Sequence, residues 1–429
     1  MRYMPIDLSL FVTNRERFIK QLKQNAIAVF HSNDIMPRSA DGTYPFVQNP
    51  DLFYLSGMDQ EDTVLLIYPD AKETKHKEIL FIRKTSDEIA IWEGNKLSRE
   101  EAQKISGIQT IFWTEDFQKI FRSVVLDAER IYLNTNEHAR ADVTVETRDS
   151  RFLKWCREIY PLHQYERLAP IMQNLRSIKT RMEIDLIQKA CEITEKAFRR
   201  VLQVVKPGIW EFEVEAEILH EFLKNRSRRP AFDPIVASGF NACVLHYTEN
   251  NQQCRKGDLL LIDFGAEYSN YASDVTRTIP VSGKFSERQR QIYEAVHRIQ
   301  KQAIKMLIPG NTFHDYHKEV SKVVESELIQ LGLLTSQDKS REGDENPLYK
   351  KYFMHGISHH LGLDVHDLGD KHRVFEAGMV LTCEPGIYVR EEETGVRIEN
   401  DILITEQGPI DLTRKIPSDP AEIEDLMNS

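Results

Sequence analysis

The amino-acid sequence predicts an α/β domain followed by a larger α+β domain. Over the first 170 residues, short apolar runs alternate with helical stretches, which is typical of a sheet covered by helices. Over the rest, helices with recognisable N-terminal caps separate runs of alternating apolar and polar residues. Because 429 residues are too many for one ordinary domain, we place two, at residues 1–170 and 171–429.

The N-terminal domain is expected to hold four buried strands and two helices. The strands are short apolar runs at Ala26–Phe30, Thr63–Tyr68, Glu78–Ile82 and Arg130–Leu133. The helices are expected at Glu101–Ile105 and Phe152–Glu158. Polar residues in this domain are scattered without the spacing of ligands, so we expect no site chemistry there.

A capping box marks the first helix of the C-terminal domain. Thr180 precedes Glu183 by three residues, and apolar residues then recur at helical spacing as far as Pro207-Gly208. Further helices are expected at Glu211–Leu223, between a Ser286 cap and Pro309-Gly310, and at His314–Leu331. Strands are expected in a mostly antiparallel sheet, at Leu259–Phe264, Tyr271–Val281, Met379–Glu384 and Val396–Thr405.

Composition excludes several classes of protein. The net charge of −11 argues against nucleic acid as a partner, because phosphates demand clustered Lys and Arg. The chain has no apolar segment near the roughly 20 residues of a membrane span and no signal-peptide core, so we expect a cytoplasmic protein without a membrane partner. The five cysteines form no CxxC pair, which indicates reduced core thiols. Nucleotide-binding glycine loops and a GxSxG elbow are also absent.

Two aspartates stand on apolar strands, where a lone carboxylate is costly to bury. Asp263 ends one run, and Asp274 follows eleven residues later on the next. If the chain turns near Tyr268-Ser269, the two aspartates lie opposite each other and repel. A cation between them would remove that conflict. A solvated hairpin with incidental acids is the alternative.

A second pair of carboxylates repeats this pattern downstream. Glu384 ends an apolar run before Pro385, and Glu399 shares a strand face with Arg397 and Asp401. Taken alone, Glu384 could be a surface acid beside a turn. The two acidic pairs, one in each half of the domain, are interpreted as halves of a single site.

Histidines cluster between the two acidic pairs. Four of the chain's 14 histidines fall within twelve positions, at His355, His359, His360 and His366. Imidazole is the commonest metal ligand, although a single histidine is more often a core or surface residue. Carboxylates with imidazole suit Mn²⁺, with Co²⁺, Fe²⁺ and Zn²⁺ as alternatives. Four carboxylates overcharge one ion and balance two, which predicts a two-metal hydrolase.

These residues resemble the pita-bread metallopeptidases, the creatinase/aminopeptidase-like proteins, and most closely aminopeptidase P. In the C-terminal half the resemblance is carried by LHYTEN, LIDFGAEYSNYASDVTRT, HGISHHLGLDVHD, TCEPGIYV and GVRIENDILIT. In the N-terminal half it is carried by RSADGTYPF and NPDLFYLSGM, so it covers essentially the whole chain. It implies an aminopeptidase-P-like α/β N-terminal domain and an α+β pita-bread catalytic domain.

The resemblance also implies a ligand set. Two divalent ions, typically Mn²⁺, would be bound by Asp263, Asp274, His359, Glu384 and Glu399. Asp274 and Glu399 would bridge both ions. Glu384 would also act as general base, with a metal-bridging hydroxide as nucleophile. His360 stands where relatives often carry an aromatic residue, and the resemblance assigns the ligand to His359.

Further roles follow from the same resemblance. His246 and His355 would contact the substrate around its proline, and His366 would stabilise the oxyanion. Arg397 would hold the site from behind its ligands, and Tyr388 is a weaker candidate. Trp92 matches a tryptophan that can approach the site of a neighbouring subunit; a buried anchor is the alternative.

The implied activity is removal of the N-terminal residue from peptides with proline in second position. Prolidase, restricted to Xaa-Pro dipeptides, is the alternative, and methionine aminopeptidase is disfavoured by the large N-terminal domain. A non-catalytic pita-bread binding module is a third possibility, but such a protein should have lost ligands, and all five are present. We expect a homo-oligomer, either a dimer or a tetramer.

Overall fold

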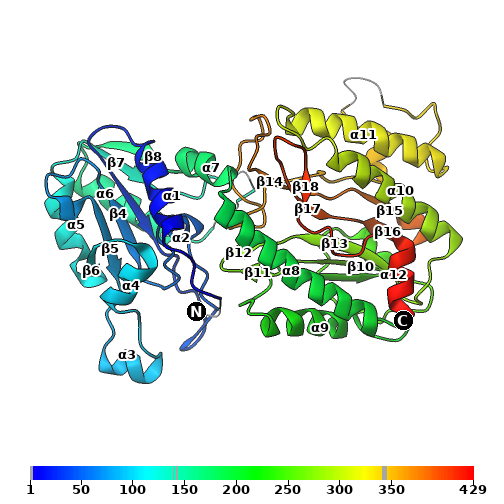
Figure 1. Ribbon diagram of the computed structural model, residues 1–429, viewed down its shortest axis with the longest axis horizontal. Coiled ribbons are helices and arrows are strands. Elements are labelled where there is room, and N and C mark those ends of the chain that lie inside the picture. Colours follow the sequence, from blue (N-terminus) through cyan, green and yellow to red (C-terminus); the bar gives the residue numbers. More distant parts are fainter. Residues whose placement is uncertain (1–2, 139, 142–143, 341–344) are drawn as a thin grey trace. The chain divides into compact units, whose positions relative to one another are not determined.

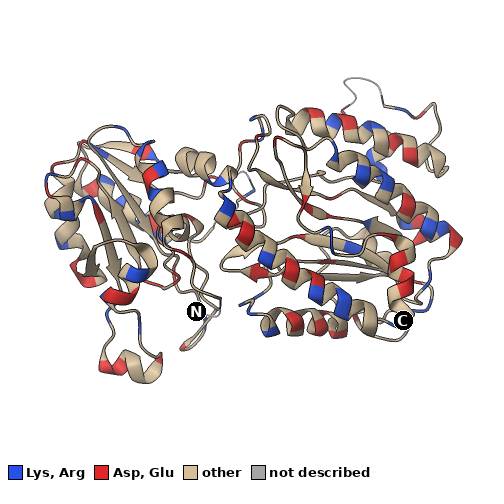
Figure 2. Ribbon diagram, viewed as in Figure 1, with Lys and Arg blue, Asp and Glu red and all other residues tan. Residues whose placement is uncertain are grey.

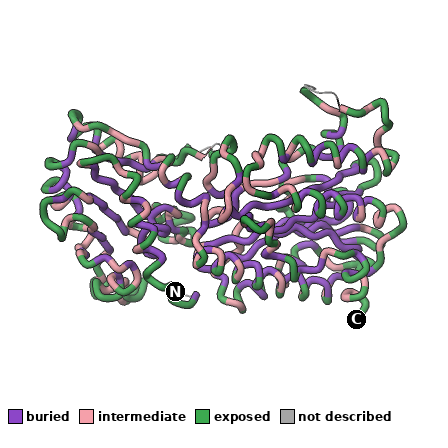
Figure 3. Tube along the Cα trace, turned by 45° about the horizontal axis from the view of Figure 1, so that its top comes forward, coloured by how far each residue is buried: buried purple, intermediate pink, exposed green. Residues whose placement is uncertain are grey.

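The structure is a computed structural model that describes residues 3–138, 140–141, 144–340 and 345–429 (Figure 1). It divides into two compact units, Tyr3–Leu175 and Arg176–Ser429. In each unit buried strands form the centre, and the helices expose their outer faces (Figure 3). All five cysteines are buried and free, as predicted. Among the described residues, no helix combines the length and apolar character needed to cross a membrane.

The first unit is an α/β domain around one mixed sheet, in the order β6-β5-β4-β1-β7-β8. These strands are β1 (Ala26–His31), β4 (Val64–Ile67), β5 (Glu78–Ile82), β6 (Thr110–Trp113), β7 (Arg130–Leu133) and β8 (Gln164–Arg167). Helices α1 (Ser9–Ile19), α2 (Pro50–Ser56), α4 (Arg99–Ser106), α5 (Phe117–Val125) and α6 (Arg148–Ile159) accompany them. The four predicted strands are confirmed. The sequence pattern does not predict β6 and β8, because each is only four residues long and has no continuous buried run.

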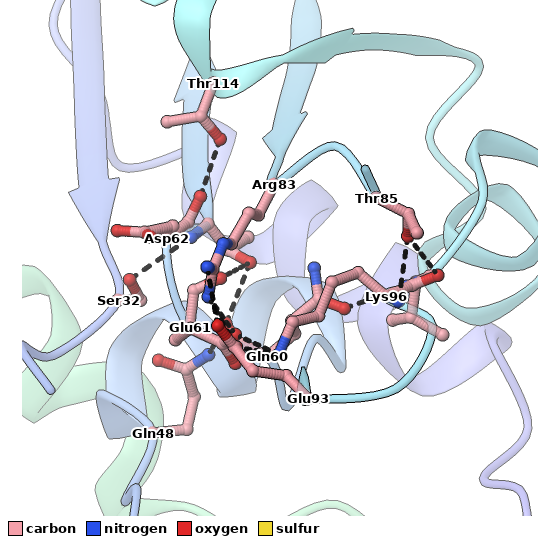
Figure 4. A network of polar contacts seen from close by, with 12 residues as sticks. Ser32, Gln48, Gln60, Glu61, Asp62, Arg83, Thr85, Glu93, Lys96 and Thr114 are labelled. Atoms are coloured by element: carbon pink, nitrogen blue, oxygen red, sulfur yellow. Dashed lines mark hydrogen bonds and ion pairs between the residues drawn. The ribbon is translucent and has the colours of Figure 1, made fainter. Parts of the chain in front are cut away.

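A short helix, α3 (Asp87–Trp92), lies at the tip of an arm that leaves the sheet after β5 (Figure 1). Trp92 is 82% exposed, so the alternative of a buried anchor is wrong. The base of the arm is closed by ion pairs (Figure 4). Glu61 Oε1 lies 3.0 Å from Arg83 Nη1 and 2.6 Å from Lys96 Nζ, and Glu93 pairs with both cations. The arm is therefore held at its base by side chains, while its tip contributes nothing to the core.

Replacing Glu61 by Gln should loosen the base of this arm. Glu93 would then be the one carboxylate of this network that still pairs with Arg83 and Lys96. We expect the free energy of unfolding to fall by about 1–2 kcal/mol, measured by urea denaturation. Burial raises the pKa of Glu61, but Lys96 and Arg83 outweigh it and hold that pKa below the usual 4.5. Its contribution is therefore present above that value and is lost as the pH falls through the folded-state pKa.

The matched control is Glu146→Gln, which breaks a pair between exposed Glu146 and Lys154. Exposed pairs contribute little, so this variant should unfold like the wild type. Equal stability of the Glu61 and Glu146 variants would contradict the role assigned to the ion pairs at the base of the arm.

The second unit is an α+β domain in which every strand ladder of the described residues is antiparallel. Its helices are α8 (Arg181–Val204), α9 (Glu211–Lys224), α10 (Glu287–Ile304), α11 (Phe313–Gln330) and α12 (Pro420–Met427). Charges of both signs run along α8, α10 and α11 (Figure 2). The capping boxes at Thr180 and Ser286 are confirmed. Helix α10 ends before the predicted stop at Pro309-Gly310.

Two strands predicted as continuous are each broken. The first becomes β12 (Tyr271–Ala272) and β13 (Val275–Pro280), and the second becomes β16 (Thr394–Arg397) and β17 (Asn400–Leu403). The remaining strands are β9 (Ile235–Ser238), β10 (Leu259–Phe264), β11 (Glu267–Tyr268), β14 (Val380–Cys383), β15 (Gly386–Val389) and β18 (Ile410–Asp411). Arg397 and Glu399 therefore do not share one strand face, because the chain passes between two sheets at this break.

The predicted pairing of Asp263 with Asp274 is wrong, because the turn that joins the two strands lies one residue later in the chain than predicted. The turn residues are Ser269 and Asn270, both with positive φ, and Asp263 pairs with Thr276. Moving the centre of a turn by one residue moves each partner by two. Asp274 therefore lies at the break, diagonal to Asp263, and its amide donates to Asp401 Oδ2 (3.1 Å).

Candidate metal centre

The two strand breaks place two carboxylates at the middle of the second unit. Asp274 precedes β13, and Glu399 precedes β17. The amide of Glu399 donates to the carbonyl of Thr276 (3.0 Å), which brings the breaks side by side. Both carboxylates are buried, and with His359 they offer ligand atoms that all lie within 4.8 Å of one another.

The loop before β14 orients His359. Its amide donates to Thr382 Oγ1 (3.1 Å), and its Nδ1 lies 3.0 Å from the carbonyl of His360. A carbonyl only accepts, so Nδ1 carries the hydrogen and Nε2 presents the lone pair with which a neutral imidazole binds a metal. That Nε2 faces Asp274 Oδ2 at 3.4 Å and Glu384 Oε1 at 3.8 Å.

Arg397 connects the two pairs of carboxylates through hydrogen bonds. Its Nη2 donates to Asp263 Oδ2 (2.7 Å), and its Nε donates to Thr276 Oγ1 (2.9 Å). Thr276 in turn donates to Glu399 Oε2 (2.7 Å). The third branch, Nη1, donates to Tyr388 O–H (2.9 Å). One buried guanidinium thus fixes three oxygens around the carboxylates.

The electrostatic environment of these carboxylates favours a cation in addition to Arg397. Burial raises the pKa of Asp274 well above its usual range, and the charges of Glu399 and Asp263 raise it further. Burial and the charges of Glu384 and Asp263 do the same to the pKa of Glu399. In addition, buried Asp263 Oδ1 has no hydrogen-bond partner. Oxygen-rich donors, mutual repulsion and an unpartnered oxygen all fit divalent metal ions.

The other predicted histidines lie beside this centre. His355 Nε2 is 2.8 Å from Tyr388 Oη, and its Nδ1 is 2.7 Å from the carbonyl of Gly356 and 3.6 Å from Glu384 Oε2. Burial lowers the pKa of His355 to about 3, helped by Arg397 and by His246. His355 is therefore neutral, its Nδ1–H donates to the carbonyl of Gly356, and the Glu384 carboxylate lies nearby. The exposed ring of His366 lies edge-on to the His359 ring, at 4.3 Å between centroids.

The structure thus brings the five candidate ligands, His355, His366 and Arg397 into one region, and it adds several residues. His246 is exposed, and its charge contributes to the lowered pKa of His355. Thr276 links Arg397 to Glu399 through two hydrogen bonds. Thr276 is two residues after Asp274, so alternation along a strand could have placed both side chains on one face and indicated a role for Thr276 in the site. Tyr388, a weaker candidate from the sequence, bridges Arg397 and His355. Arg277 is fully buried and donates to the Glu399 carbonyl (2.7 Å). No sequence signal distinguishes Arg277 from a solvent-exposed strand arginine.

Known proteins match the chain in both units. Residues 185–406 match metallopeptidase family M24, and residues 11–132 match the aminopeptidase P N-terminal domain. The Xaa-Pro aminopeptidases of Haemophilus influenzae and Escherichia coli are 37% and 35% identical, each aligned over 97% of both proteins. The structure of E. coli aminopeptidase P with the inhibitor Pro-Leu has a TM-score of 0.86 at 34% identity, covering 99% of both chains.

The fold and these matches define a metallopeptidase with an additional N-terminal domain. The chain belongs to metallopeptidase family M24, in the group of the Xaa-Pro aminopeptidases. The resemblance found in the sequence is confirmed, as are the α/β N-terminal domain and the pita-bread catalytic domain. Membership of a metallopeptidase family also implies divalent metal ions and a peptidase function.

Proposed function

We propose that this protein is an Xaa-Pro aminopeptidase that releases the N-terminal residue from peptides with proline in second position. The observation that carries the proposal is the cluster of Asp274, His359 and Glu399, a ready metal site in an M24 chain. Relatives named Xaa-Pro aminopeptidase, aligned over nearly the full length, support the substrate class. Proline lacks an N–H and fixes φ, so ordinary peptidases handle this bond poorly.

The proposed ligands hold two divalent ions. Asp263, Asp274, His359, Glu384 and Glu399 are the residues that would bind these ions. Mn²⁺ suits four carboxylates and one imidazole, and Co²⁺, Zn²⁺ and Fe²⁺ are alternatives. When bound, such ions supply Lewis acidity and lower the pKa of a water toward about 7. Two divalent charges also balance the four carboxylates.

The remaining side chains have separate proposed tasks. Glu384 accepts the proton of the attacking water, and its Oε2 lies 3.6 Å from Nδ1 of neutral His355. His355 and His246 contact the substrate around its proline. His366 donates to the oxygen of the scissile carbonyl as negative charge develops there. Arg397 keeps Asp263 and Thr276 in place through the two bonds described above.

We also propose a homo-oligomer, either a dimer or a tetramer. Trp92 at the tip of the arm would approach the site of a neighbouring subunit, in keeping with its 82% exposure. Sedimentation of the purified chain tests this proposal: a monomer at assay concentration would contradict it.

Two properties of the substrate distinguish the candidate functions: the length of the peptide and the identity of its second residue. The Mn²⁺-loaded protein should cleave Xaa-Pro-Xaa peptides and release one free amino acid, measured by chromatography. An Xaa-Ala-Xaa peptide should be cleaved with a kcat/KM roughly 100-fold lower. Turnover of Xaa-Pro dipeptides alone would favour prolidase. A protein that binds no metal and cleaves nothing after Mn²⁺ addition would favour a binding module.

A further inference from the structure

A buried ion cluster lies at the foot of the loop that carries His359 and His366. Asp367 Oδ1 lies 2.5 Å from Arg176 Nη2, and Asp367 Oδ2 lies 3.0 Å from Lys179 Nζ. All three side chains are almost fully buried, with 1–3% of each exposed. The partly exposed Asp364 also accepts from Arg176 Nη2 (2.7 Å). Two cations and two carboxylates therefore balance.

Asp367 acts on His359 through one backbone oxygen. The amide of Asp367 donates to the carbonyl of His360 (2.9 Å). That carbonyl is the same one that accepts from His359 Nδ1 (3.0 Å) and so fixes the orientation of the ring. His366 is the residue before Asp367, and its ring contacts the His359 ring. Movement of Asp367 would therefore displace both rings.

The loop has no room to adjust. A Cβ atom at Gly362 would lie 2.1 Å from Asp367 Oδ2, and a Cβ atom at Gly369 would lie 1.9 Å from His360 Cδ2. The cluster is also tied to the turn just before β14, since the amide of Lys179 donates to the carbonyl of Gly378 (2.9 Å). The loop backbone thus packs tightly against the Asp367 carboxylate at Gly362 and against the His360 ring at Gly369.

Such a cluster fixes a geometry more than it stabilises the fold. A buried ion pair contributes little net free energy compared with apolar packing, but separating it leaves an unpaired buried charge. Burial raises the pKa of Asp367, yet Arg176 and Lys179 outweigh it and lower that pKa to about 2. Asp367 is therefore ionised at every pH suited to assay.

We propose that Asp367, held by Arg176 and Lys179, is a positioning residue that sets the rings of His359 and His366 for metal binding and catalysis. The inference rests on the proposed function for its catalytic part. Its metal-binding part concerns only the orientation of His359 and can be tested without any substrate.

The test compares Asp367→Asn with Glu327→Gln. Glu327 is an equally buried carboxylate of the same unit, and it accepts two bonds from Arg298 at 3.0 and 2.7 Å. Three quantities are measured for each variant: Mn²⁺ affinity by calorimetry, kcat and KM on an Xaa-Pro-Xaa peptide, and the unfolding midpoint in urea.

Asp367→Asn should weaken Mn²⁺ binding and lower kcat at saturating Mn²⁺, each by about 10- to 100-fold, while KM changes little. Glu327→Gln should lower the unfolding midpoint by less, because its partner Arg298 is 48% exposed, and it should leave Mn²⁺ affinity and kcat near the wild-type values. If Asp367→Asn changed only the unfolding midpoint, as Glu327→Gln does, the residue would be merely structural and the proposal would be overturned.

A milder variant tests the proposal if Asp367→Asn does not fold. Lys179→Met leaves the Asp367–Arg176 pair, so it should show a smaller loss of Mn²⁺ affinity in the same direction. Wild-type Mn²⁺ affinity in Lys179→Met would also overturn the proposal. If the wild-type protein cleaved no Xaa-Pro-Xaa peptide, the proposed function would fail, and the Mn²⁺ affinities would still decide the role of Asp367.

Discussion

Asp274→Asn is expected to abolish peptidase activity while leaving the protein folded. Asp274 Oδ2 lies 3.4 Å from His359 Nε2. The charges of Glu399, Asp263, Asp401 and Glu384 all raise the pKa of the Asp274 carboxyl. Asparagine keeps the shape but removes the charge a metal needs. We expect kcat/KM to fall by at least roughly 1000-fold, about 4 kcal/mol of transition-state stabilisation.

The same substitution should leave the metal-free protein at least as stable as the wild type. Removing one of several buried like charges relieves repulsion, so the unfolding midpoint in EDTA should stay or rise. The stabilisation that Mn²⁺ gives to the wild type should largely disappear, because weaker binding stabilises less. Near wild-type turnover would refute the role of Asp274. A lower midpoint in EDTA would show instead that the carboxylate supports the fold.

The elements of this fold could be predicted from the sequence where the signal is local. Thr180 and Glu183 form a capping box within four residues, and the strand Glu78–Ile82 is a continuous apolar run. The short strand β8 was missed because its residues Gln164–Arg167 are polar and only their pairing with β7 makes them a strand. The breaks at Asp274 and Glu399 were missed because β-branched residues close to each break, such as Val275 and Ile398, let the strand pattern continue across it.

The site follows the same rule. Carboxylates on apolar strands and clustered histidines are visible in the sequence, because each is unusual among its neighbours. Assigning His359 rather than His360 needed the family resemblance, whereas the structure gives a physical reason: His360 is buried against Phe313 and Gly369. The contacts of Asp367 with Arg176 and Lys179 span more than 180 positions. No periodicity or motif in one sequence encodes such a contact.

Arg397→Met should destabilise the metal-free protein more than the metal-loaded protein. Arg397 is the guanidinium that bonds Asp263, and both side chains are largely buried, with 5% and 13% exposed. Burial lowers the pKa of Arg397, but Tyr388, Asp263 and Glu399 raise it well above its usual value. Losing one partner of a buried pair leaves an unpaired charge, and we expect the free energy of unfolding in EDTA to fall by about 3–5 kcal/mol.

Saturating Mn²⁺ should reduce that deficit, because cations among the carboxylates replace the lost positive charge. Urea denaturation of wild type and variant, each with EDTA and with Mn²⁺, measures the difference. Arg397→Lys is the matched control. Lysine keeps the positive charge but cannot make all three hydrogen bonds of the guanidinium, so this variant should retain most of the stability and lose activity. An equal deficit with and without Mn²⁺ would mean that Arg397 acts by packing alone, and that the carboxylates do not share one electrostatic environment with the metal ions.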